Sequence, residues 1–156
     1  MLPSLRCRST IMYHTNAIVM NAAEEMIFEA VANLERWPAF LPHYRYIRYY
    51  EKGPVRNLVK MAANRGAIPI AWMSEQIIDR ENREIRFKHL KAWTKGMKVV
   101  WKFRPLPGGV EVQIIHDLAF RVPALAPVAE PIIGGFFINY IATQTLHHMK
   151  AYVEKK

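Results

Sequence analysis

Residues 44–120 alternate apolar and polar side chains with a period of two, and this pattern constrains the fold more than any other feature of the 156-residue chain. A period of two is typical of β-strands that bury one face. Turn signals at Lys52-Gly53-Pro54, at Gly66 and at Pro107-Gly108-Gly109 help to divide the stretch into six strands. The predicted strands cover residues 44–50, 55–61, 68–78, 84–91, 97–104 and 110–120.

The residues before this stretch predict one more strand and two short helices. Residues 11–19 alternate and are rich in β-branched side chains, which indicates a first strand. The spacing of Asn21 and Glu24 predicts a capping box at the start of a helix that ends near Asn33. Two prolines, Pro38 and Pro42, then limit the next helix to about residues 34–40.

The residues after the strands predict a single long helix. Pro131 fits its first turn, and the helix is expected to end near Glu154. Gly134-Gly135 predicts a close contact between this helix and the sheet. Its apolar stripe comprises Ile138, Ile141, Ala142, Thr145, Met149 and Val153. The fold class is therefore α+β: a curved antiparallel sheet of six to seven strands wrapped around a long C-terminal helix, with two short helices after strand 1. We expect residues 1–8 to be a disordered tail and residues 9–156 to form one domain.

A sheet wrapped around one helix cannot touch it everywhere, so we expect an internal cavity that is open at one end. The alternation places Ser74, Gln76, His89 and His116 on the inner face of this sheet. Burying an unpaired polar group costs about 1–3 kcal/mol, so these residues form either a satisfied core network or the wall of a wet pocket. Their position on several strands beside three tryptophans favours the pocket. Its aromatic wall is predicted to hold Trp37, Tyr44, Trp72 and Trp101, with Trp37 and Tyr44 near the mouth.

The net charge of +9 is concentrated between residues 80 and 104, where nine Lys and Arg residues stand against Glu81 and Glu84. The outer face of one hairpin carries Arg86, Lys88, Lys98, Lys102 and Arg104. This face is either simply solvated or docks an acidic partner, such as an acyl carrier protein, an anionic membrane surface or RNA. No aromatic residues alternate with these charges, so nucleic-acid binding by base stacking is not expected.

Other classes of protein are disfavoured by what the sequence lacks. The longest span without charge, residues 131–149, contains too many polar and helix-breaking residues for a transmembrane segment. No apolar stretch follows the basic N-terminal residues as it would in a secretory signal. The single cysteine, Cys7, suits a cytoplasmic location. The common nucleotide, hydrolase and zinc motifs are missing, so we predict no cofactor and no metal.

Two segments, residues 33–44 and 71–76, together with the order of elements, resemble the START-like superfamily of helix-grip proteins. The resemblance is closest to its polyketide cyclase/dehydrase branch, which also includes coenzyme Q-binding and ribosome-association relatives. It covers residues from about 11 to 154. In aromatase/cyclases of this branch, the resemblance implies a pocket that folds a poly-β-ketone chain and promotes aldol closure and dehydration.

The resemblance also implies roles for individual residues. It assigns the pocket aromatics to Trp37, Trp72 and Trp101, the mouth tyrosine to Tyr44, the pocket serine to Ser74, and a polar position on the long helix to Thr145 or Asn139. Where those cyclases carry a catalytic arginine this sequence has Gln76, and a second family arginine appears as His89. Gln76 can orient a carbonyl group, but it has no charge with which to stabilise an enolate.

Three hypotheses follow. In the first, the protein is an aromatase/cyclase or dehydratase in which Tyr44, His89 and His116 move protons while Gln76 and Ser74 hold carbonyl groups. In the second, it is a non-catalytic carrier of a lipid or a quinone, of the coenzyme Q-binding type, that docks on anionic membranes. In the third, it associates with the ribosome or RNA, and its binding falls steeply with salt. A ligand-binding domain of the cyclase branch is favoured.

Overall fold

The computed structural model describes residues 11–91, 94–119, 124 and 126–155. Its strands form one antiparallel sheet in the order β1-β7-β6-β5-β4-β3-β2. Strands that follow one another from β2 to β7 are therefore neighbours, and β1 closes the order by pairing with β7. The strands are β1 Ile11–Met20, β2 Tyr44–Glu51, β3 Arg56–Arg65, β4 Ile68–Asp79, β5 Glu84–His89, β6 Lys98–Leu106 and β7 Gly109–Ala119.

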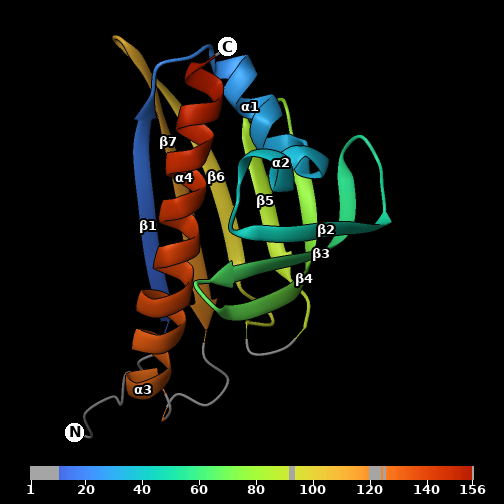
Figure 1. Ribbon diagram of the computed structural model, residues 1–156, viewed down its shortest axis with the longest axis vertical. Coiled ribbons are helices and arrows are strands. Elements are labelled where there is room, and N and C mark those ends of the chain that lie inside the picture. Colours follow the sequence, from blue (N-terminus) through green and yellow to red (C-terminus); the bar gives the residue numbers. More distant parts are fainter. Residues whose placement is uncertain (1–10, 92–93, 120–123, 125, 156) are drawn as a thin grey trace, which may run out of the picture.

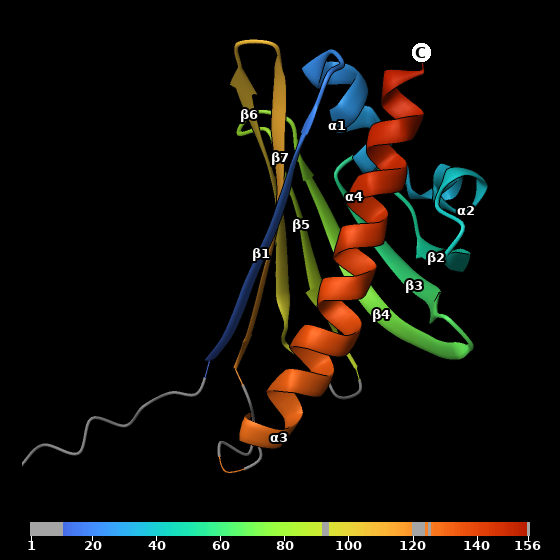
Figure 2. The same ribbon diagram turned by 60° about the vertical axis from the view of Figure 1, so that its left-hand side comes forward.

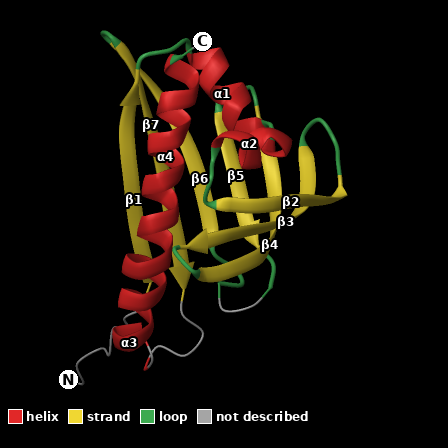
Figure 3. Cartoon of the chain, viewed as in Figure 1, coloured by secondary structure: helices red, strands yellow, loops and turns green. Residues whose placement is uncertain are grey.

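The helices lie on the concave side of this sheet. They are α1 Glu24–Ala32, a 3-10 turn Leu34–Arg36, α2 Trp37–Phe40, α3 Ala126–Glu130, a π-helical segment Pro131–Ile138, and α4 Asn139–Glu154. Figures 1 and 2 show the sheet curving around α4, with α1 and α2 near the C-terminal end of that helix. Figure 3 shows the same division into one sheet and a helical layer. The predicted α+β helix-grip fold with seven strands is confirmed.

The first helix packs as its sequence predicts but begins differently. Ile27, Phe28 and Val31 are fully buried, as expected from their spacing. The predicted capping box is wrong, because the residue before the helix is Ala23 and no side chain caps it. The backbone N–H of Asn21 donates instead to Oε1 of Glu154 at 2.8 Å, so a contact between the two ends of the fold takes its place.

The C-terminal helical region begins earlier than predicted. It starts with α3 at Ala126, and Pro131 opens the π-helical segment rather than a first turn. Pro131 has no backbone N–H to donate, so it disturbs the helix least at the point where the hydrogen bonding changes from the α to the π pattern. The predicted close contact is found at Gly134, where an added Cβ would overlap the His14 ring and lie 3.0 Å from Sδ of Met12. Gly135 faces open space.

The strands bury the face that points toward α4. In β1, Met12 and Met20 are fully buried, whereas Tyr13 is 62% and Val19 41% exposed. The alternation of β1 thus identified the strand, but its more β-branched face is the outer one. No helix in the described part of the chain is long and apolar enough to span a bilayer. The tail predicted for residues 1–8 lies outside the described residues.

Candidate ligand-binding site

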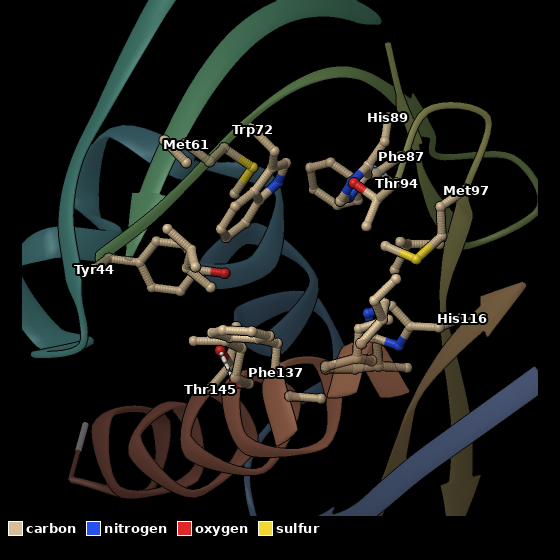
Figure 4. A pocket seen from close by; sticks show the side chains of 18 of the residues that line it. Tyr44, Met61, Trp72, Phe87, His89, Thr94, Met97, His116, Phe137 and Thr145 are labelled. Carbon is tan, nitrogen blue, oxygen red and sulfur yellow. Dashed lines mark hydrogen bonds between the residues drawn. The ribbon is translucent and has the colours of Figure 1, made fainter. Parts of the chain in front are cut away.

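A cavity of about 470 Å³ lies between the inner face of the sheet and the C-terminal helical region. Figure 4 shows side chains from the strands and the helix converging on it. Its wall consists of Trp37, Tyr44, Met61, Ile68, Pro69, Ile70, Ala71, Trp72, Phe87, His89, Thr94, Met97, Val99, Trp101, Ile114, His116, Ile133, Phe137, Ile138, Ile141, Ala142 and Thr145. Seven of the ten predicted site residues are in this wall: Trp37, Tyr44, Trp72, His89, Trp101, His116 and Thr145.

The mouth of the cavity lies elsewhere than predicted. Trp37 and Tyr44 are only 2% and 6% exposed, so the expectation that they flank the mouth is wrong. The exposed wall residues are Ile68, Pro69 and Ala71, all in the first part of β4. The short helix α2 explains the difference, because it carries Trp37 into the closed end.

Trp37 is fixed in place at that closed end. Its Nε1–H donates to the carbonyl oxygen of Ala30 at 3.0 Å, which satisfies its one polar group. Its ring meets Tyr44 edge-on with centroids 5.2 Å apart, and lies 5.9 Å from the ring of Trp101. Such tilted aromatic contacts are favourable and hold the rings in defined orientations. The wall at this end is therefore rigid.

His89 lines the opposite part of the cavity. Its Nδ1 lies 2.8 Å from Oγ1 of Thr94, and its ring is parallel to that of Trp72, with 5.8 Å between centroids. Burial lowers the pKa of His89 to about 4, so the imidazole is neutral at pH 7. Thr94 was missed because it lies in the turn between β5 and β6, where no alternation indicates which way a side chain points.

His116 on β7 also faces the cavity, and it has a neighbour that the sequence analysis missed. Burial, together with repulsion by His89 and His14, lowers its pKa to about 3. Its Nδ1 is buried and has no partner within the described residues, and the same holds for Nε2 of His14. His14 pairs directly with His116 across β1 and β7. Its place in the alternation of Met12 and Met20 could have revealed it.

A third group of polar side chains joins Tyr44 to the helix. The hydroxyl of Thr145 donates to the carbonyl oxygen of Ile141 at 2.7 Å. Nε2 of His43 lies 2.8 Å from the same hydroxyl oxygen, and because that hydroxyl hydrogen is already used, His43 is the donor. Burial, helped by His148, lowers the pKa of His43 to about 4. Burial also raises the pKa of Tyr44 well above its usual value, an effect that a hydrogen bond with Thr145 partly opposes.

Three predicted site residues lie outside the wall. Nε2 of Gln76 donates to the carbonyl oxygen of Ala32 at 3.2 Å, and its Oε1 accepts from Asn57 at 2.9 Å. Ser74 donates to the carbonyl oxygen of Lys88 at 3.3 Å. Both side chains point inward as predicted, but their hydrogen bonds are made with the protein and they do not reach the cavity.

Asn139 is the third of these residues. It is exposed, and its Oδ1 accepts from Nδ2 of Asn16 at 2.8 Å. Of the two polar positions considered on the long helix, Thr145 is the one that lines the cavity. The difference follows from the helical period, because residues six apart lie on different sides of a helix.

Acidic residues beside the predicted basic face offset part of its positive charge. Arg86 pairs with Asp79 at 3.1 Å and with Glu84 at 3.4 Å. Arg104 pairs with Glu111 at 3.0 Å, and Lys102 lies 3.9 Å from Glu84. The strand register also sets Glu75 opposite Lys88 and Asp117 opposite Lys98. The charge count along the sequence had included only Glu81 and Glu84, so it overestimated the positive charge of this face.

A curved antiparallel sheet around one long helix, with a partly open, aromatic-lined cavity between them, is the helix-grip fold. The model of the polyketide cyclase/dehydrase and lipid transport family matches residues 20–137, and the chain belongs to that family.

Individual relatives agree with this assignment. The chain is 25% identical to a putative polyketide cyclase of Streptomyces cyaneus over 115 residues, which is 71% of this chain and 76% of the relative. It is 27% identical over 108 residues to the actinorhodin polyketide synthase bifunctional cyclase/dehydratase of Streptomyces coelicolor, covering 68% of this chain but only 34% of that protein. The crystal structure of the Zhui aromatase/cyclase from Streptomyces sp. R1128 superposes with a TM-score of 0.78 at 15% identity, over 93% of this chain and 94% of that one.

Proposed function

We propose that the protein binds a polyketide-like ring precursor in this cavity and promotes its cyclisation and dehydration. One observation carries the proposal: the cavity wall is apolar and aromatic except for a few polar side chains, with Tyr44 and Thr145 on one side and His89, Thr94 and His116 on the other. Such a wall can fold a flat, hydrophobic chain and still offer groups that move protons. Family membership and the two polyketide cyclase relatives support the same assignment.

The proposed chemistry is an aldol closure. A base removes a proton from a methylene group between two carbonyls, the resulting enolate carbon attacks a ketone carbon, and a C–C bond forms. The new alkoxide takes up a proton, and the hydroxyl group then leaves as water together with a proton from the adjacent carbon. The protein thus needs a proton acceptor and a proton donor, and no oxidant or reductant.

His89 and Tyr44 suit these two roles. With its Nδ1 beside Thr94, the neutral His89 can present Nε2 to a substrate as a base. Its low pKa makes it a weak base, which fits a doubly activated methylene rather than an ordinary C–H bond. Tyr44 stays protonated at neutral pH and can donate to the alkoxide. Gln76 and Ser74 are not part of this proposal.

The test is ring closure of a poly-β-ketone presented as a thioester, with the products separated by mass spectrometry. We expect Tyr44→Phe and His89→Gln each to slow closure about 100-fold, the size of a typical acid–base contribution. Matched controls are Tyr13→Phe and His147→Gln, because both wild-type side chains are exposed. Unchanged product formation by both site variants would refute the catalytic proposal.

A non-catalytic carrier is the second candidate, and one observation favours it. Among the described residues, the cavity wall holds no cation that could stabilise an enolate, which is usually the largest electrostatic contribution to such a reaction. A lipid or a quinone would fill the same space without needing one. Mass spectrometry of an organic extract from the purified protein separates the candidates: a quinone or lipid supports the carrier, and an aromatic polyketide supports the cyclase. Docking of an acidic carrier protein or an anionic membrane on the outer face stays a prediction.

A further inference from the structure

Within the described part of the chain, the cavity wall contains no formally charged residue. Among its 22 residues there is no Asp, Glu, Lys or Arg. The nearby guanidinium of Arg65 is occupied: its Nε donates to the carbonyl oxygen of Phe136 at 2.7 Å, and it lies 3.8 Å from the centre of that ring. This arginine fastens the β3–β4 hairpin to the helical segment and does not contribute to the wall.

The titratable residues of the wall are neutral as well. Burial lowers the pKa of His89 to about 4, and burial together with repulsion by His89 and His14 lowers that of His116 to about 3. Burial keeps the phenol of Tyr44 protonated. At neutral pH the cavity therefore offers a ligand dipoles and aromatic faces, but no counter-charge.

Transfer of an anionic group from water into such a cavity is unfavourable. It loses its water shell on entry and finds no cation to replace it, and burial of an unpaired charge is among the most unfavourable changes in a protein interior. The hydroxyl and imidazole groups of the wall are neutral donors, so they can hydrogen-bond to an anion but supply no counter-charge, and the Thr145 hydroxyl already donates to Ile141. A neutral ligand with the same ring loses much less.

We propose that the cavity selects electrically neutral ring compounds and rejects the same rings when they carry a carboxylate. This inference rests on the proposed function and sharpens its substrate class. If the substrate is a polyketide, its carboxyl end enters as an ester or thioester, or has already been lost. The reaction that supplies the substrate must therefore leave that end masked or remove it, and any hydrolysis to the free acid must come afterwards.

The test compares two ligands of nearly equal size, anthraquinone-2-carboxamide and anthraquinone-2-carboxylate, at pH 7.5. Binding is followed by quenching of tryptophan fluorescence, since Trp37, Trp72 and Trp101 line the cavity. We expect the carboxylate to bind at least about tenfold more weakly than the amide. Equal or tighter binding of the carboxylate would overturn this inference while leaving a ligand-binding cavity intact. Failure of both ligands to bind would instead count against the proposed function.

A gain-of-function variant sharpens the test. His89→Arg introduces a cation into the wall and should bring the affinity for the carboxylate to at least that for the amide. Lys88→Arg is the matched control. Lys88 is next to His89 in the sequence, but its side chain is exposed and points to the outer face, so this substitution should leave the preference unchanged. If His89→Arg does not fold, Thr94→Lys places a cation in the same part of the wall from a turn. Unchanged rejection of the carboxylate by a folded variant would overturn the electrostatic explanation.

Discussion

The two ends of the protein interior differ in how their buried polar groups are satisfied. At the closed end, Gln76 bridges Asn57 and the carbonyl oxygen of Ala32, and Oδ1 of Asn57 accepts from the backbone of Gly53 at 2.8 Å. Beside the cavity, His14, His43 and His116 each have a buried ring nitrogen without a partner in the described part of the chain.

This difference separates structural polar groups from those available to a ligand. A buried polar group without a partner is unfavourable, so native proteins keep few of them and most have a specific reason. The Gln76 network ties β3 and β4 to the end of α1 and needs nothing more. The histidines beside the cavity are explained if a ligand or water completes their hydrogen bonds.

The largest expected effect is a loss of stability at acidic pH. His43, His89 and His116 have folded pKa values of about 4, 4 and 3, below the ordinary value of 6.5. The unfolded chain therefore binds protons that the folded chain does not, and stability falls as the pH drops below 6.5. Each histidine contributes roughly 1 kcal/mol for each pH unit until its folded pKa is reached.

Urea unfolding between pH 7.5 and 5 measures this dependence. His116→Asn should reduce the slope, whereas His147→Asn, at an exposed position, should leave it unchanged. A slope that does not change in the His116 variant would mean that its imidazole is already protonated or solvated in the folded protein.

Breaking the closed-end network should come next in size. Gln76→Ala removes two hydrogen bonds, leaves Nδ2 of Asn57 and the carbonyl oxygen of Ala32 without these partners, and should lower the free energy of unfolding by about 3 kcal/mol. Gln113→Ala, on the outer face, is the control and should change it by less than about 0.5 kcal/mol. If Gln76→Ala kept its full stability but no longer bound ligand, Gln76 would have to be assigned to the binding site.

The fold was largely predictable from the sequence because both of its signals are local. Alternation with turns indicated the strands, and one apolar stripe indicated the long helix, with Ala142, Met149 and Val153 all buried as expected. The inward direction of Gln76 followed from the same alternation. Its partners did not, because Asn57 meets it only through the β3–β4 register and Ala32 only through tertiary packing.

The site was predictable only in part, because alternation along a strand is a local signal and gives no direction for residues outside the strands. Trp72, His89 and His116 lie on strands whose alternation indicates direction, and all three line the cavity. Thr94 lies in a turn, and His43 directly precedes a strand, where a period of two gives no guidance. The capping role expected of Asn21 failed because Glu154, 133 residues away, takes its backbone N–H.

Adding a methyl group at Gly134 should show how closely the helical segment approaches the sheet beside the cavity. Gly134→Ala places a carbon against the His14 ring and near Met12 and should cost about 1–3 kcal/mol through overpacking. Gly135→Ala meets nothing within 4 Å and is the matched control. Equal stability of the two variants by urea unfolding would show that the close contact at Gly134 does not exist in solution.

The smallest expected change in stability comes from a polar group that has no partner. His116→Leu keeps a similar volume and removes a buried nitrogen without a hydrogen bond, so the free energy of unfolding should change by less than about 1 kcal/mol, or rise. Unfolding of this variant at pH 7.5 provides the measurement. A loss as large as that of Gln76→Ala would mean that both ends of the interior are structural.

The most direct test of the difference between the two ends is an NMR titration with anthraquinone-2-carboxamide at pH 7.5. The ring nitrogen signals of His89 and His116 should shift as the ligand binds, because both side chains line the cavity. The side-chain amide signals of Gln76 and Asn57 should stay in place, because they are hydrogen-bonded to each other behind the wall. Saturable binding that shifts Gln76 and Asn57 but neither histidine would contradict the assignment of the cavity end to the ligand.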